Sequence, residues 1–143
     1  MVRFNSKAEV HLGGCLRKEF LGRGIGFPFR FDTASGGVAM SEYEANIRDC
    51  INVILATRPG ERQMMPSFGC RVHEEIFAPN TRSTATRAAK MVEKAIKRWE
   101  PRVDVTDVTA SVEADGKVRV KVKYKIRSTL SEQELSLFLN ASG

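Results

Sequence analysis

The sequence has few cysteines, only two histidines and no long apolar run. Its cysteines, Cys15, Cys50 and Cys70, are odd in number and lack a Cys-x-x-Cys spacing, so we expect neither a disulfide framework nor a zinc cluster, and a reducing compartment is the natural setting. No apolar run approaches the ~18 residues of a transmembrane helix, and the first nine residues lack the apolar stretch of a secretory signal. We therefore expect no membrane span and no signal peptide.

The rest of the composition is ordinary for one globular domain. The chain has 143 residues, of which 42% are hydrophobic and 28% charged, which fits a single domain with its own core. Its net charge of +6 comes from basic residues concentrated toward the two ends of the chain. Such a charge permits an acidic or nucleic-acid partner but does not establish one.

Residues 1–32 predict an extended arm. Glycines between positions 22 and 26 interrupt any period, and they are not a phosphate-binding loop because Phe-Pro-Phe follows where a helix should begin. Phe27, Phe29 and Phe31 then alternate around a proline, which suits a sheet edge or a segment laid on another surface. So many aromatic side chains need burial, either in the core of this chain or against a partner.

Two helices follow. The first is predicted to begin with a capping box, Ser41 and Glu44, to carry an apolar stripe at helical spacing, and to end near Arg58, which precedes a proline. The second is predicted to be capped by Asn80 or Thr81 and to bury a stripe of small and apolar residues before a proline stops it.

The second half of the chain predicts a β-hairpin of defined register. Apolar residues alternate with lysines and arginines after the turn. A two-residue turn would place Val112 on the charged face, whereas a three-residue loop at 114–116 pairs Val112 with Val118 and keeps the apolar side chains together. The same register sets Asp107 opposite Lys123.

A third strand is predicted where Leu135, Leu137 and Leu139 alternate. The order of elements then gives an α+β fold, with two main helices packed on one face of a small antiparallel sheet and an extended N-terminal arm. We predict the arm at residues 1–32 and a single domain at residues 33–143.

No group of residues predicts catalysis, a metal or a cofactor. His11 and His73 have no further ligands at a useful spacing. A glycosidase needs two carboxylates that face each other across a cleft, and no spacing selects a pair. The available glutamates are Glu61, Glu74, Glu75 and Glu100.

The basic stripe at residues 117–127 has the charge to follow a phosphate backbone. Its polar face, however, has no aromatic platforms, which single-strand binders use, and Asp107 partly neutralises it. A solvated sheet face is therefore favoured over nucleic-acid binding, and a docking face for an acidic protein stays open.

Glu100, Pro101 and Arg102 lie where the second helix meets the first strand of the hairpin. In the simplest interpretation they stop the helix and expose two charges. In the other, the proline fixes the turn, so that the carboxylate and the guanidinium point in set directions suited to bidentate pairing with a partner.

Six short motifs, in this order, resemble the baseplate wedge proteins, or sheath initiators, of contractile phage tails and related contractile injection systems. The resemblance extends over about residues 22–128. The motifs are GIGFPFRFD (24–32), GGVA (36–39), LATRPGER (55–62), PSFGC (66–70), FAPN (77–80) and RWEPRV (98–103).

This resemblance implies a non-enzymatic assembly component. It implies that the element from Glu100 to Arg102 docks on the helical core bundle of the wedge. It also implies that the strand-rich part offers an edge on which the first sheath ring pairs strands. The edge candidates are the strand with Leu135, Leu137 and Leu139, and the segment Phe27–Phe31.

Further expectations concern partners and location. Phe27, Phe29 and Phe31 are expected to contact neighbouring subunits, with tube or spike-hub proteins as partners of the arm. The particle is expected to assemble in the bacterial cytoplasm and to carry this chain in its baseplate, without a nucleic-acid or membrane partner. Two alternatives stay open: a peptidoglycan-cleaving enzyme, which an old lysozyme-like label of the family suggests, and a basic nucleic-acid-binding module.

Overall fold

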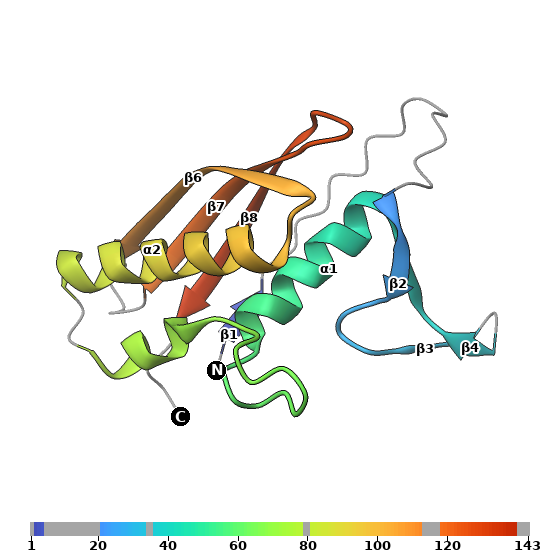
Figure 1. Ribbon diagram of the computed structural model, residues 1–143, viewed down its shortest axis with the longest axis horizontal. Coiled ribbons are helices and arrows are strands. Elements are labelled where there is room, and N and C mark those ends of the chain that lie inside the picture. Colours follow the sequence, from blue (N-terminus) through green and yellow to red (C-terminus); the bar gives the residue numbers. More distant parts are fainter. Residues whose placement is uncertain (1, 5–20, 34–35, 79–80, 113–117, 140–143) are drawn as a thin grey trace.

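The computed structural model describes residues 2–4, 21–33, 36–78, 81–112 and 118–139, and it confirms the α+β fold. The main sheet is antiparallel with strand order β1-β8-β7-β6. Figure 1 shows α2 lying across one face of this sheet, with α1 beside it. The strands are β1 (Val2–Phe4), β6 (Val103–Val112), β7 (Val118–Ile126) and β8 (Glu132–Leu139).

The helices form where the apolar period predicts them. They are α1 (Tyr43–Ala56), the 3-10 helix η2 (Arg71–Phe77) and α2 (Arg82–Trp99). The Thr81 hydroxyl caps α2 by accepting the Thr84 N–H, which confirms one of the two predicted caps. The predicted stripes of both helices enter one core with the apolar face of β7.

The predicted capping box of α1 is wrong. Ser41 lies in the short strand β5 (Met40–Glu42), and Glu42 stands at the N-cap without a side-chain cap bond. The backbone of β5 is committed to a β-ladder, so the helix begins only at Tyr43, whose φ of 55° turns the chain. Glu44 instead accepts a hydrogen bond from the Ser131 hydroxyl.

The predicted hairpin register is confirmed where the structure describes it. Val112 pairs with Val118, and Asp107 lies opposite Lys123. Alternate side chains of β7 are buried, as the pattern requires. The predicted three-residue loop, 114–116, lies outside the described residues.

The third strand is also confirmed, since β8 pairs along its length with β7. The sequence analysis missed a fourth strand, β1, which pairs with residues 137–139 of β8. Three residues carry too little alternation to predict a strand.

A second, smaller part projects away from the main sheet, on the far side of α1 (Figure 1). In it β2 (Arg23–Ile25) pairs with β5, and β3 (Phe31–Asp32) pairs with β4 (Gly37–Val38). We call this part, residues 21–33 and 36–42, the N-terminal hairpin. It includes the last residues of the expected arm, and the boundary at residue 32 stays a prediction.

Candidate protein-docking surfaces

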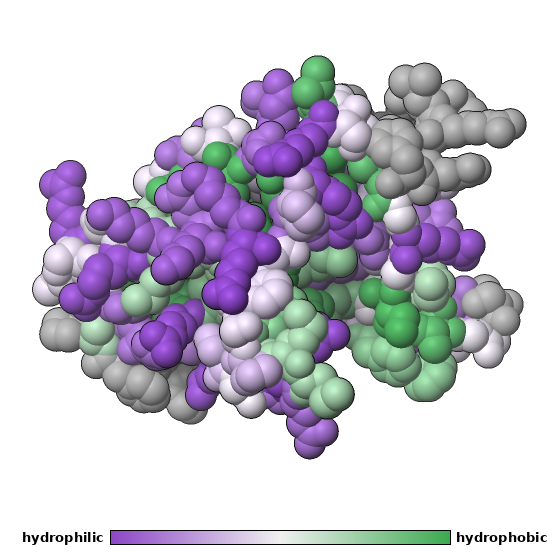
Figure 2. Space-filling model, in the orientation of Figure 1, coloured by the Kyte–Doolittle hydropathy of each residue, from purple (hydrophilic) through white to green (hydrophobic). Residues whose placement is uncertain are grey.

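The N-terminal hairpin exposes a cluster of large apolar side chains. Phe31 is 73% exposed, Ile25 60% and Phe29 57%, and the Phe29 and Phe31 rings meet edge to face with centroids 5.3 Å apart. Figure 2 shows the resulting hydrophobic patch on the projecting part of the molecule. Contiguous exposed apolar surface of this kind marks an interaction site. The apolar hairpin patch consists of Ile25, Phe27, Phe29, Phe31 and Met40.

The sequence analysis found three of these five residues and missed Ile25 and Met40. These two are register partners across β2 and β5, so their side chains lie together on one face of the ladder. The alternation of the phenylalanines gave a signal for the patch. The strands β2 and β5 have only three residues each, so the sequence carries no signal for the pairing that brings Ile25 and Met40 into the patch.

The Glu100–Arg102 corner is turned inward. The Glu100 side chain is 4% exposed and that of Arg102 33%. Arg102 Nε and Nη2 donate to the two carboxylate oxygens of Glu100 at 2.6 and 2.5 Å, and these bonds raise the pKa of the Arg102 guanidinium. The interpretation as two exposed charges is therefore wrong, because the bidentate pair forms within the chain.

Arg102 also reaches the base of the N-terminal hairpin. Its Nη1 donates to the carbonyl oxygen of Leu21 at 2.8 Å and to Asn46 Oδ1 at 3.3 Å. Leu21 is itself buried in the core. The corner thus joins α1, the end of α2 and the hairpin, while Pro101 stays exposed between its two charged neighbours.

The outer edge of β8 is only partly covered. Leu135 and Leu137 are buried in the core, so their side chains serve the fold. Among the described residues, β1 covers the edge at 137–139, and no strand pairs with it at 132–136. In the described part of the chain, the outward backbone groups of residues 132–136 are therefore open to the addition of a strand.

The charged face of the sheet is close to balanced. Lys123 lies between Asp107 and Glu134, its register partners on the neighbouring strands. Lys121 Nζ also lies 3.9 Å from Glu134 Oε1. Such cross-strand pairs neutralise the basic stripe, which favours a solvated face over one that follows phosphates.

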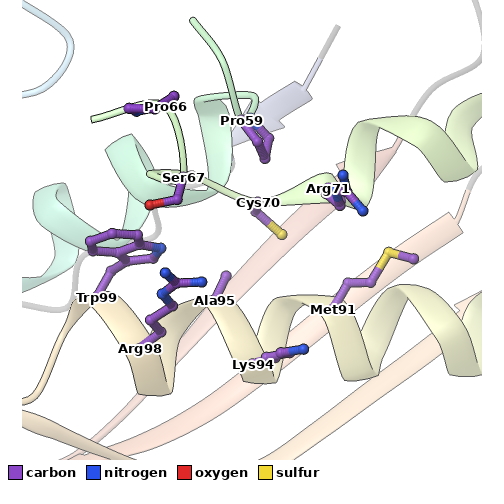
Figure 3. Close-up of a pocket in the computed structure, with 11 residues that line it drawn as sticks. Pro59, Pro66, Ser67, Cys70, Arg71, Met91, Lys94, Ala95, Arg98 and Trp99 are labelled. Atoms are coloured by element: carbon purple, nitrogen blue, oxygen red, sulfur yellow. The ribbon is translucent and has the colours of Figure 1, made fainter. Parts of the chain in front are cut away.

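A surface cavity of about 510 Å³ lies between α2 and the loop that follows α1. Figure 3 shows Trp99, Arg98 and Lys94 along one wall, with Pro59 across from them. No lining residue carries a carboxylate. The one thiol, Cys70, is buried, which raises its pKa to about 11, so it stays protonated and unreactive at neutral pH.

The glutamates considered for catalysis are engaged elsewhere. Glu75 Oε2 accepts from Arg87 at 2.9 Å, and Glu61 Oε2 accepts from the Arg58 backbone N–H, also at 2.9 Å. Glu74 is exposed beside an arginine of its own helix. A glycosidase needs two carboxyl groups that flank one scissile bond, whereas these side chains are bonded to neighbours in the fold or exposed on it. The arrangement therefore favours a structural role for these side chains.

The histidines lend no support to a metal site. His73 is buried with Nε2 3.0 Å from the Leu55 carbonyl oxygen, and burial lowers its pKa. His11 lies outside the described residues. Within the part of the chain that the structure describes, no cluster of three or more His, Cys, Asp or Glu residues is placed to hold a metal ion, and no helix has the length and hydrophobicity to cross a membrane.

Comparison with known sequences identifies two related phage baseplate proteins. The chain is 29% identical to baseplate wedge protein gp25 of Enterobacteria phage T4 over 82 residues, which are 57% of this chain and 62% of that protein. It is 30% identical to baseplate protein W of Escherichia phage P2 over 108 residues, 76% of this chain and 91% of that protein. The chain therefore spans less than two thirds of the T4 protein and nearly all of the P2 protein.

Solved structures share the fold. A Geobacter sulfurreducens protein described as a tail lysozyme matches with a TM-score of 0.66 and 33% identity, covering 72% of this chain and 95% of that one. A chain of the anti-feeding prophage baseplate matches with a TM-score of 0.63 and 25% identity, covering 88% and 90%. A chain of the pyocin R2 baseplate, 23% identical over 70% of this chain and 99% of its own length, has a TM-score of 0.57 and supports the fold alone.

The motifs that suggested a resemblance lie largely within the region that a family comparison identifies. The family of baseplate wedge protein gp25 matches residues 41–131. This match covers more than half of the chain and includes both helices and the β6–β7 hairpin. The chain belongs to the baseplate wedge protein gp25 family.

Proposed function

We propose that this chain is a structural component of the baseplate of a contractile tail or injection system, where it joins the wedge core bundle to the first sheath ring. Membership of the gp25 family supports this role. The observation that carries it is the apolar hairpin patch, a set of large side chains exposed on a hydrogen-bonded projection. A protein without a binding partner would bury such large apolar side chains in its own core.

The proposed contacts with the wedge lie around the Glu100–Arg102 corner. Pro101 and a third of the Arg102 side chain are exposed there, next to the base of the N-terminal hairpin. We assign this region to the core bundle, and we propose the arm, with Phe27, Phe29 and Phe31, as the contact for neighbouring subunits such as tube or spike-hub proteins. Neither a nucleic acid nor a membrane is part of the proposal.

The proposed contact with the sheath is the outer edge of β8. The Ile126 N–H donates to the Ser131 carbonyl, and antiparallel strands alternate inward and outward N–H groups. The N–H groups of Glu134 and Ser136 therefore point to the outer edge, away from β7. An extended segment of a sheath subunit can continue the sheet there by strand addition.

Sheath assembly on particles that carry Glu134→Pro tests this contact. Proline removes one outward N–H without touching the β7–β8 ladder, so we expect sheaths to be absent or short in electron micrographs. Glu134→Ala is the matched control, since it removes the same charge and keeps the N–H. Sheaths of normal length on a folded Glu134→Pro protein contradict the strand-pairing role.

The proposal also holds that the chain cleaves nothing. The Geobacter relative described as a tail lysozyme makes peptidoglycan hydrolysis the alternative to test. We expect the purified chain to leave the turbidity of a cell-wall suspension unchanged at a concentration a hundredfold above that of an active lysozyme control. Clearing that is abolished by Glu75→Gln or Glu61→Gln, on a folded chain, contradicts the structural role.

A further inference from the structure

The inward-facing corner raises the question of how Arg102 reaches a partner. Its guanidinium has five N–H groups, and at least four of them donate within the chain, to Glu100, Leu21 and Asn46. The carboxylate of Glu100 is almost fully buried. A direct bidentate contact with a partner would require these bonds to break.

The same bonds hold the N-terminal hairpin to the body of the molecule. Leu21 lies two residues before β2, and Arg102 Nη1 donates to its carbonyl oxygen at 2.8 Å. The next residue, Gly22, accepts the Tyr43 N–H at 3.1 Å, which ties both ends of the hairpin base together. Gly24 packs so closely on Asn46 that a Cβ there would come within 2.5 Å of Asn46 Nδ2.

The burial of the Glu100 carboxylate restricts this corner to one geometry. A buried carboxylate without its cation is costly, so the Glu100–Arg102 pair persists only in the geometry that keeps it bidentate. That geometry fixes the third donor, Nη1, on the Leu21 carbonyl. The direction in which β2 leaves the core is therefore set by the corner.

We infer that Glu100 and Arg102 form an internal latch that sets the direction of the N-terminal hairpin, and that this corner acts on partner capture through the apolar hairpin patch. The inference deepens the proposed function and rests on it in one respect, that the patch binds a baseplate subunit. Glu100 and Arg102 are positioning residues in this scheme. Phe29 and Phe31 make the contact.

Hydrogen–deuterium exchange of the isolated chain tests the latch without any partner. The amides to follow are those of the hairpin ladder, in β2 and β5. Because hydrogen bonds to charged groups are among the stronger ones, we expect Arg102→Ala to raise their exchange rates by about tenfold or more. The amides of β7 should stay within about twofold of the wild-type rates.

Three further variants sharpen the test. Arg87→Ala is the matched control: it removes another arginine–carboxylate pair, with Glu75 at 2.9 Å, which joins α2 to η2 and not to the hairpin. Arg102→Lys keeps the charge but loses the fork, so we expect intermediate exchange. Gly24→Ala leaves the Glu100–Arg102 pair in place and displaces the buried Asn46 side chain, which accepts from Arg102. It should therefore also raise the exchange rates, and it serves if Arg102→Ala does not fold.

Capture of purified wedge core-bundle, tube and spike-hub subunits by the same variants separates an indirect role of the corner from direct contact with a partner. The latch predicts that capture falls in step with hairpin exchange across Arg102→Ala, Arg102→Lys and Gly24→Ala. Exchange within twofold of wild type in both Arg102→Ala and Gly24→Ala overturns the latch, and lost capture with unchanged exchange assigns Arg102 to direct contact instead. If exchange rises but Phe29→Ala with Phe31→Ala binds every baseplate subunit normally, the latch stands and the proposed role of the patch fails.

Discussion

Replacing Phe29 and Phe31 together by alanine should weaken partner binding while leaving the fold intact. Burying a whole phenylalanine side chain contributes about 1.5–3 kcal/mol. Phe29 and Phe31 are 57% and 73% exposed, so a partner can still bury a little more than the surface of one phenylalanine. We expect binding to weaken by about 2–4 kcal/mol, which is roughly 30- to 1000-fold in Kd.

Biolayer interferometry against purified wedge, tube and spike-hub subunits from the same genome measures this effect. The free energy of unfolding should change little, because both residues are more than half exposed. Met64→Ala is the matched control, since Met64 is 98% exposed on a loop outside the patch. Equal Kd values for the double variant and Met64→Ala would refute the assignment of the patch as a binding surface.

Three other predictions concern the fold that supports these surfaces. Leu137→Ala, in the buried face of β8, should lower the free energy of unfolding by about 2–5 kcal/mol, and a loss below 1 kcal/mol in urea titrations would contradict its place in the core. Cys70, with a pKa raised to about 11, should resist iodoacetamide at pH 8 in the native chain and react in urea, as peptide mass spectrometry can show. Because burial lowers the pKa of His73 in the folded chain, the unfolded chain takes up the proton first, so stability should fall as the pH drops below about 6.5. His73→Gln should remove that part of the pH dependence.

Much of the main sheet and both long helices were predictable because their residues repeat a period. The alternation along β7 gave both the strand and its register, since only one loop length keeps Val112 on the apolar side. The stripe of α2 gave the helix and its buried face in the same way. Where a segment is long enough to show a period of 2 or 3.6, local sequence and tertiary packing agree.

The short elements were not predictable for the opposite reason. Ser41 and Glu44 carry a genuine capping signature, yet the ladder between β2 and β5 holds Ser41 in an extended conformation. Strands β1 to β5 contain two or three residues each, so their pairing depends on which backbone groups meet in the folded chain. Tertiary contacts therefore determined the conformation of these residues and, through it, which side chains make up the apolar hairpin patch.

The sequence could not predict that Glu100 and Arg102 turn inward, because a motif of two charges around a proline does not indicate whether those charges are buried. The latch that we propose gives that corner a consequence for assembly. β5 continues into α1 at Tyr43 without a loop, α1 packs on α2, and α2 packs on β6. β6 is joined to β8 through β7, so a hairpin held by the proposed latch at Leu21 is fixed in orientation relative to β8. In the proposed function, one subunit must meet neighbouring baseplate subunits with the corner and the hairpin and meet the sheath with β8, and a fixed angle between these surfaces lets the first contact determine where the sheath strand is added.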